Sequence, residues 1–299
     1  MDNLTHGFIG ALIGQAGLKR RTGLAMPALI IGANLPDIDA TCTIYGLESL
    51  AMRRGLTHGP IAWLLLPLAL AAILYGWDRW QGSRGKRPEG RLPVRFGWLY
   101  GLALVACLTH PALDWLNNYG IRFLEPFSSR WFYGDILFII DLWLWLGLGY
   151  ATWRSLRIEK KTGGEWRRPA RIARAAALVY IGLNAGITWR AEQRALTSEP
   201  YPAVAIASEV PVLFWRREII AGDGDGIWRI GGRTFGDLPL DRCDFEQARG
   251  RDARLDAFLF WSRAPFVERT GDGQWLLRDG RFASTDRFSV ALPPSTCPA

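Results

Sequence analysis

Residues 96–115 have the sequence FGWLYGLALVACLTHPALDW, which is apolar apart from His110 and Asp114. This length matches the roughly 20 apolar residues that a helix needs to cross a bilayer. His110 and Asp114 are four residues apart, so they project from one face of a helix. Ionisable groups within a membrane are costly unless they are partnered, and they mark functional sites. The stretch therefore predicts a transmembrane helix that carries a polar site.

Three other runs have a similar length and composition, at residues 61–77, 136–153 and 173–189. The helices of a soluble bundle should each show a polar face, and these runs show little of one. We therefore expect four transmembrane helices. Two shorter apolar stretches precede them, at residues 4–18 and 23–35. Each is about 20 Å long as a helix, too short to cross the membrane, so we expect a helical hairpin with a basic tip at residues 19–21.

The charges of the connecting segments predict an orientation in the membrane. Residues 78–95 contain six Lys or Arg against two acidic residues, and residues 154–174 contain eight against two. Residues 114–135 contain only two against three. The positive-inside rule places the two basic segments and the hairpin tip in the cytoplasm. The net charge of +8 then reflects membrane orientation, and we expect no nucleic-acid partner because no nucleic-acid motif accompanies it.

The last hundred residues differ in character from the rest. Short β-branched or aromatic segments separated by Gly and Asp turns predict strands at residues 210–215, 227–230, 257–261, 274–277 and 287–292. We expect a helical membrane domain at residues 1–192 and a β-rich extracytoplasmic domain at residues 193–299. An oxidising compartment would permit a disulfide between Cys243 and Cys297, but the sequence leaves that pairing open.

The chain has three histidines, and each one follows Leu-Thr. Histidine and aspartate bind borderline divalent metals, and Asp37 and Asp39 lie between the first two histidines. The predicted orientation puts all these residues at the external ends of their helices. Because the loop charges that set this orientation are independent of the histidines, the agreement supports a common site. We therefore predict a metal site, with zinc expected and manganese as the alternative. Its candidate ligands are His6, Asp37, Asp39, His58, His110 and Asp114.

The same residues allow plainer interpretations. His110 and Asp114 could share only a hydrogen bond on a helix surface, and Asp37 and Asp39 could cap backbone amides. In the functional interpretation, two or three imidazoles with carboxylates leave one coordination position for water, which attacks an ester or phosphoester. Asp37 or Asp39 would then act as general base, and Arg54 would hold a phosphate or oxyanion. Cys107, near His110, is a weaker ligand candidate.

These motifs together resemble the YdjM-type family of membrane-bound metal-dependent hydrolases of bacterial inner membranes. The resemblance is carried by Leu4-Thr5-His6, by residues 33–39 (ANLPDID), by residues 54–58 (RGLTH) and by residues 109–114 (THPALD), and it extends to the β-rich tail. It implies a multi-pass inner-membrane protein with a metal site and hydrolase activity. The family often has a histidine where this chain has Arg53, which leaves the number of metal ions open.

The sequence therefore favours a membrane-embedded metal-dependent hydrolase. It would act near the outer membrane face on an ester or phosphoester, with a lipid as one candidate substrate. Two other functions stay open. The polar cluster could carry ions or protons without catalysis. Alternatively, the helices could serve as an anchor that presents the β-rich domain to a partner.

Overall fold

The computed structural model describes residues 1–285 and 288–298. The chain forms two compact units. The first consists of Met1–Asp39 and Arg54–Leu183, and the second of Ala40–Arg53 and Asn184–Ala299. The first unit is helical, and the second contains two antiparallel sheets.

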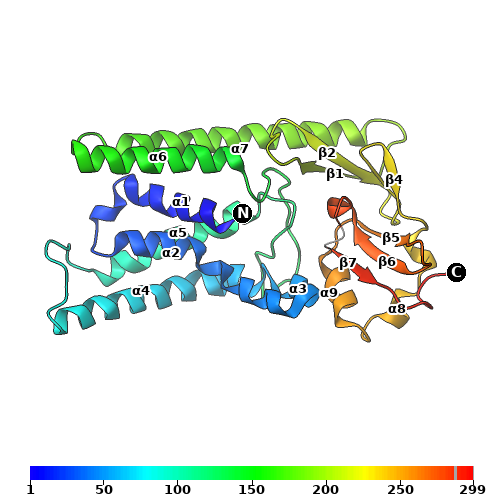
Figure 1. Ribbon diagram of the computed structural model, residues 1–299, viewed down its shortest axis with the longest axis horizontal. Coiled ribbons are helices and arrows are strands. Elements are labelled where there is room, and N and C mark those ends of the chain that lie inside the picture. Colours follow the sequence, from blue (N-terminus) through cyan, green and yellow to red (C-terminus); the bar gives the residue numbers. More distant parts are fainter. Residues whose placement is uncertain (286–287, 299) are drawn as a thin grey trace. The chain divides into compact units, whose positions relative to one another are not determined.

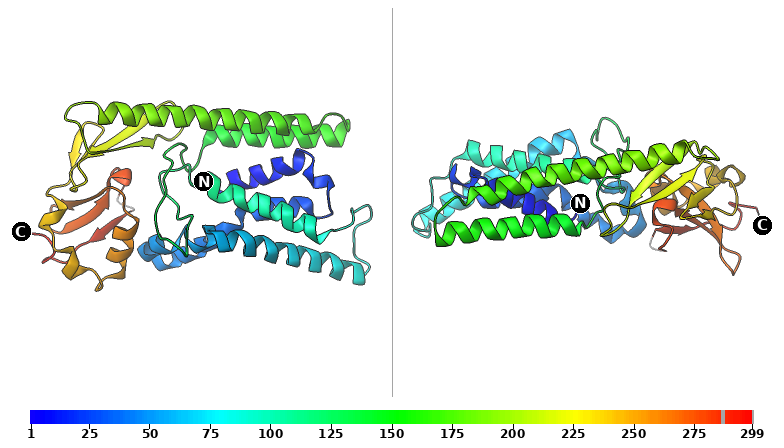
Figure 2. Two further views of the ribbon diagram at one scale, coloured as in Figure 1. Left: turned by 180° about the vertical axis from the view of Figure 1, so that it is seen from behind. Right: turned by 90° about the horizontal axis from the view of Figure 1, so that it is seen from above.

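The helical part consists of α1 Asn3–Gln15, α2 Ala25–Asn34, α4 Pro60–Ser83, α5 Phe96–Asp114, α6 Leu142–Lys161 and α7 Arg167–Leu196 (Figures 1 and 2). Helices α1 and α2 form the expected hairpin, with the turn Leu18–Arg20 at its tip. Helix α5 packs against both α2 and α4, and α6 packs against α1. Glycine allows the close contact within the hairpin, since a Cβ on Gly10 would lie 2.4 Å from the Leu29 carbonyl oxygen.

Small residues also bring α2 and α5 together. A Cβ on Gly32 would lie 3.0 Å from the Ala103 carbonyl oxygen, and Ala103 and Ala106 are fully buried. Close approach at small residues is the usual way in which membrane helices pack. Two fully buried leucines, Leu29 of α2 and Leu99 of α5, lie in neighbouring apolar clusters of the same unit. This packing fixes the ends of the helices that carry the candidate site.

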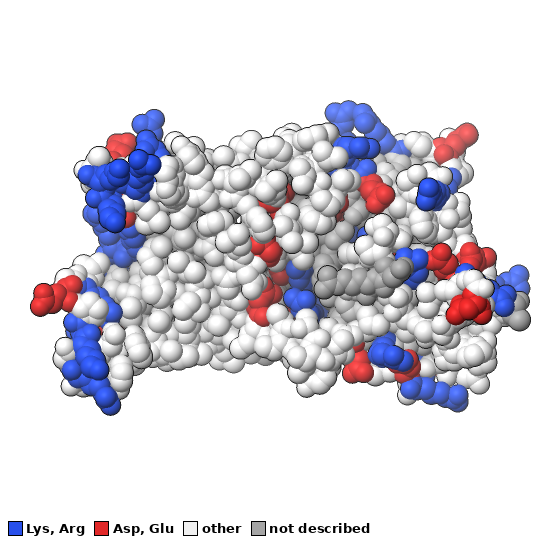
Figure 3. Space-filling view, viewed as in Figure 1, with Lys and Arg blue, Asp and Glu red and all other residues white. Residues whose placement is uncertain are grey.

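Among the described residues, three helices are long and apolar enough to cross a membrane: α4, α5 and α7. Helix α6, the fourth expected span, has 20 residues but carries five charged side chains in its second half. Lys and Arg side chains gather where α6 meets α7 and where α4 meets α5, beyond a largely uncharged surface (Figure 3). This distribution agrees with basic connections flanking membrane-crossing helices.

The start of α6 corrects one prediction. The sequence predicted a span over residues 136–153, which would place Asp141 inside the helix. Helix α6 instead begins at Leu142, and Asp141 is its N-cap. The Asp141 carboxylate accepts a hydrogen bond from the Leu144 backbone N–H at 2.9 Å, which satisfies one of the free amides of the first turn. The Tyr180 hydroxyl of α7 donates to the same carboxylate at 2.9 Å.

The second unit contains a four-stranded sheet of order β1-β2-β3-β4 and a three-stranded sheet of order β5-β6-β7. All strand pairs are antiparallel, with Ile206 opposite Ile220 in the first sheet and Val267 opposite Leu277 in the second. Side chains from both sheets, including Trp228 and Phe266, share one core. The strands are β1 Val204–Glu209, β2 Arg217–Gly222, β3 Trp228–Ile230, β4 Arg233–Phe235, β5 Pro265–Arg269, β6 Trp275–Asp279 and β7 Ser289–Ala291. Within the described residues, this unit also includes the end of α7 from Asn184 and the short helices α3 Ser49–Met52, α8 Phe245–Ala248 and α9 Ala253–Trp261.

Two of the five strand predictions in this unit were wrong. Residues 257–261 belong to α9, whose buried Leu255, Phe258 and Trp261 recur at helical spacing. Residues 210–215 form turns instead of a strand, because Pro211 has no N–H to donate and Val212 adopts a φ of +66°. Strands β1, β2, β4 and β5 were not predicted. Strands β3, β6 and β7 lie within or overlap the predicted segments, and Arg287 of the last segment lies outside the described residues.

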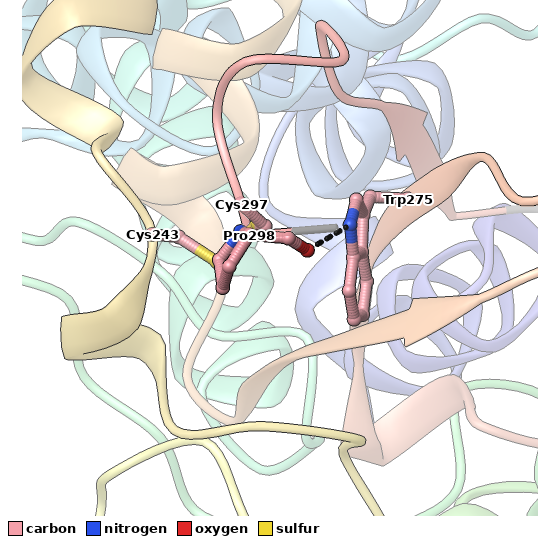
Figure 4. Close-up of a disulfide and its surroundings, with 4 residues drawn as sticks. All are labelled: Cys243, Trp275, Cys297 and Pro298. Carbon is pink, nitrogen blue, oxygen red and sulfur yellow. Dashed lines mark hydrogen bonds between the residues drawn. A yellow bond between two sulfur atoms is a disulfide. The ribbon is translucent and has the colours of Figure 1, made fainter.

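Two local features stabilise the second unit. Cys243 and Cys297 form the disulfide that the sequence left open, and the nearby Trp275 indole donates to the Pro298 carbonyl at 3.1 Å (Figure 4). The buried Asp279 carboxylate accepts from the Arg281 guanidinium at 2.8 Å. Burial alone would raise the pKa of Asp279, but the Arg281 charge and these hydrogen bonds lower it to about 2.

Candidate metal centre

Four buried or nearly buried side chains meet at one end of the helical unit. Asp37 lies in the 3₁₀ turn Leu35–Glu48 that follows α2. His58 closes the turn Leu56–His58 directly before α4, and His110 and Asp114 occupy the last turn of α5. One ligand atom from each residue lies within 4.8 Å of the others. The start of α4 at Pro60 positions His58, and the end of α5 positions His110 and Asp114. Together with Asp37 they form a compact group that could hold a metal ion.

The Asp114 carboxylate lies at the centre of this group. Its Oδ2 atom is 3.4 Å from His58 Nε2 and 3.5 Å from His110 Nε2. His110 Nε2 is also 3.6 Å from Asp37 Oδ1. The helical spacing between His110 and Asp114 thus produces the shared face that the sequence predicted.

The polar atoms that face this point lack hydrogen bonds. Among the described residues, none forms a hydrogen bond with Nε2 of His58, Nε2 of His110 or Oδ2 of Asp114, although all three side chains are fully buried. Buried polar atoms are normally satisfied, and three unsatisfied atoms facing one point need an explanation. Imidazole nitrogen and carboxylate oxygen are ligands that zinc prefers, so the donor set fits a divalent metal.

The outer nitrogens of the two rings are fixed in the form that a metal ligand requires. His110 Nδ1 lies 2.7 Å from the Ala33 carbonyl oxygen, which can only accept, so Nδ1 carries the proton. Thr57 donates its hydroxyl hydrogen to Asp39 at 2.8 Å, so its oxygen accepts from His58 Nδ1 at 2.9 Å. In the neutral ring each Nε2 is then free of a proton and can donate its lone pair.

Asp39 lies outside the group of four, on the other side of the His58 ring. It accepts from the Arg54 backbone N–H at 2.7 Å and from Thr57, and its Oδ2 is 3.3 Å from His58 Nδ1. Burial alone would raise the pKa of Asp39, but the hydrogen bond and charge of His58 lower it below its ordinary value. Asp39 is therefore held as an anion that orients this ring.

The remaining predicted residues surround Asp114. The His6 ring stacks on His110 with centroids 3.8 Å apart, and its Nε2 is 3.3 Å from Asp114 Oδ1. Arg54 Nε lies 3.2 Å from Asp114 Oδ2, and Nη1 donates to Asn117 Oδ1 at 2.8 Å. The Met1 amino group contacts the same carboxylate. All six predicted ligands and Arg54 thus lie in one place, but His6 and Asp39 fall outside the group of four.

Other candidates lie elsewhere or have other partners. Cys107 is buried in α5 and is not part of the group. Of the three threonines before the histidines, Thr57 alone contacts its histidine ring; Thr109 donates to the Ala106 carbonyl of its own helix, and Thr5 donates to Asp2. Asn117, which accepts a hydrogen bond from Arg54, was not predicted. Its position three residues after Asp114 was the available signal.

Comparison with known proteins gives one relative and one family. The Bacillus subtilis (strain 168) protein described as "Uncharacterized protein YfhP" is 31% identical over 143 residues, which cover 44% of this chain and 39% of that protein. The chain thus spans about two fifths of the length of this relative. No solved structure matches the chain. The model of the YdjM inner membrane protein family matches residues 1–191, which contain every residue of the candidate centre, and the chain belongs to this family.

Proposed function

We propose that this protein is a membrane-embedded, metal-dependent hydrolase that cleaves an ester or phosphoester in or near lipid. One observation carries the proposal: the unsatisfied Nε2 atoms of His58 and His110 and the unsatisfied Oδ2 of Asp114 face one buried point. The two ring nitrogens have no hydrogen bond to any residue that the structure describes, and Asp114 Oδ2 has only its ion pair with Arg54 at 3.2 Å. A bound cation would supply the missing interactions of these buried atoms.

In this proposal Asp37, His58, His110 and Asp114 hold the metal, with zinc expected and manganese as the alternative. A divalent metal would supply a Lewis acid and lower the pKa of bound water toward neutrality. The donor set favours zinc, because zinc suits mixed imidazole and carboxylate ligands, and it keeps manganese as the alternative, because carboxylate also suits manganese.

The surrounding residues have separate roles in the proposal. Asp39 orients His58 through Thr57. Asp37, the least buried of the four group members, would accept a proton from the attacking water. Arg54 neutralises Asp114 and attracts the anionic oxygen of the substrate. His6, which stacks on His110 outside the group of four, is an alternative metal ligand in this proposal.

We also propose that residues 1–192 form the helical membrane domain. The β-rich region at residues 193–299 then lies on the extracytoplasmic side of the inner membrane. The basic connections at residues 78–95 and 154–174 support a cytoplasmic location for the opposite ends of the helices. The Cys243–Cys297 disulfide supports an oxidising compartment for this region.

The test compares metal content and hydrolysis in detergent-purified full-length protein. His58→Ala and His110→Ala should each lose bound zinc or manganese by elemental analysis, and should lose turnover of p-nitrophenyl phosphate, p-nitrophenyl acetate or a fluorescent phospholipid. Thr109→Val is the matched control, because Thr109 bonds its own helix backbone and should leave both readouts unchanged. Unchanged metal content in both histidine variants would refute the proposed site.

Two other experiments separate the rival functions. Ion flux in liposomes without hydrolysis would favour an ion- or proton-handling protein. Loss of cellular function after deletion of everything beyond residue 198, with the metal retained, would favour an anchor for the β-rich region.

A further inference from the structure

An apolar cavity that contains none of the candidate metal ligands lies between two helices of the first unit. Helices α6 and α7 enclose a groove of about 480 Å³ that is lined almost wholly by apolar side chains. Trp143 and Tyr180 line one end, and Arg154 and Pro169 line the other. Its middle is open at Gly147, where an added Cβ would meet no atom within 4 Å, and at the exposed Ala176. The size falls within the range of small-molecule and lipid sites.

The basic end of this groove adjoins a second, polar cavity. The connection between α6 and α7 forms a pocket of about 520 Å³, where Arg167, Arg168 and Arg171 outnumber the one acidic lining residue, Glu165, beside Gly164 and Trp166. Figure 3 shows Lys and Arg gathered at this end of the two helices. No acidic side chain within residues 1–285 and 288–298 forms an ion pair with Arg154, Arg168 or Arg171. An apolar groove thus leads to several guanidinium groups without an anionic partner.

We propose that this groove binds an anionic phospholipid, with an acyl chain between α6 and α7 and the phosphate at Arg154 and Arg171. Guanidinium groups bind phosphate through paired, charge-assisted hydrogen bonds, and basic pockets between membrane helices recognise anionic headgroups. The site is independent of the metal centre and of the proposed hydrolase activity, since it shares no residue with either.

The charges favour a lipid over a second copy of the chain in the groove. Two copies in one membrane share an orientation, so a twofold contact along α6 and α7 would place the basic ends of both copies together. Like charges repel across such a contact. An anionic lipid instead offers the opposite charge at the guanidinium end and an apolar chain for the remainder of the groove.

The experiment measures lipid binding to the full-length protein by native mass spectrometry, with phosphatidylglycerol and phosphatidylcholine as the two probes. Phosphatidylglycerol should bind more tightly. The double variant Arg154→Gln, Arg171→Gln should weaken its binding about 30-fold, because each basic residue near anionic lipid contributes a factor of about five. Arg79→Gln on α4 is the charge control and should have no effect, since Arg79 does not line the groove.

A second variant tests the apolar part. Ala176→Phe should fill the groove and reduce binding of both lipids, whereas Ala72→Phe, on the exposed surface of α4, should not. Inorganic phosphate should not displace the lipid, because it lacks the acyl chain. Equal affinity for the two lipids, retained binding in the double variant and in Ala176→Phe, or cross-linking of two copies through Ala176→Cys would each overturn the proposal.

Discussion

Asp39 offers a sharp test of the candidate centre, because it contacts the His58 ring from outside the group of four ligands. Its carboxylate accepts a hydrogen bond from the Thr57 hydroxyl at 2.8 Å, and the hydroxyl oxygen accepts one from His58 Nδ1 at 2.9 Å. Partners that orient a metal-bound histidine typically contribute 10- to 100-fold in metal affinity. We therefore expect Asp39→Asn to weaken zinc binding by about 10- to 100-fold, or about 1.4 to 2.7 kcal/mol.

The relay also predicts how two substitutions combine. Thr57→Val removes the hydroxyl that joins Asp39 to His58, so it should weaken zinc binding by a similar factor. The double variant should be little worse than either single one, because residues of one hydrogen-bond network are not additive. Asp114→Asn is the reference for loss of a ligand and should abolish measurable binding.

The assay is competition for zinc between the detergent-purified protein and a chromogenic chelator of known affinity. Affinity of wild-type strength in Asp39→Asn would show that the relay does not act on the metal. If Asp39→Asn lost zinc binding as completely as Asp114→Asn, Asp39 would be a metal ligand. Additive effects of Asp39→Asn and Thr57→Val on zinc affinity would exclude a shared path through His58.

Three further predictions concern stability. The pKa of Asp279 is lowered from 3.8 to about 2 in the folded unit, so its contribution to stability is full above pH 3.8 and is lost as the pH falls toward 2. Protection of the second unit against hydrogen exchange, relative to the intrinsic exchange rate, should therefore fall over that range in wild type and not in Asp279→Asn. The double variant Cys243→Ser, Cys297→Ser should lower the free energy of unfolding of this unit by up to about 4 kcal/mol, because the disulfide closes a loop with a sequence separation of 54. Hydrogen-exchange protection measures this free energy, and an unchanged value would contradict a stabilising role of the disulfide. Gly10→Ala should destabilise the helical unit by about 1 to 3 kcal/mol in thermal unfolding, because its Cβ would lie 2.4 Å from a backbone oxygen, whereas Gly7→Ala, with its nearest atom at 3.6 Å, should be tolerated.

The long apolar runs made much of the helical part predictable. Helices α4, α5 and α7 coincide with predicted spans, and the hairpin of α1 and α2 follows its two short runs and basic tip. Short apolar runs predicted secondary structure less well. Residues 257–261 contain five apolar side chains, a run that suits either a strand or the end of a helix, and Asp252 at the N-cap decides for the helix.

The residues of the candidate centre were predictable, but their separate positions were not. Three histidines in one repeated context beside aspartates indicated a common site, and the structure brings them together. Asp37 and Asp39 look equivalent in sequence. Only the packing of the turn after α2 directs Asp37 toward His110 and Asp39 toward Thr57. The pairing of Arg54 with Asp114 likewise depends on contacts between distant segments.

The four candidate ligands come from chain segments as far apart as residues 37 and 114. A nascent chain that has emerged only as far as α4 holds two of them and cannot complete the set. In the proposed metal centre, ion capture would therefore be a late step in assembly, and its free energy would add to the docking of α2, α4 and α5 together. Depletion of the ion from cells would accordingly lower the amount of intact protein in the membrane as well as its chemistry.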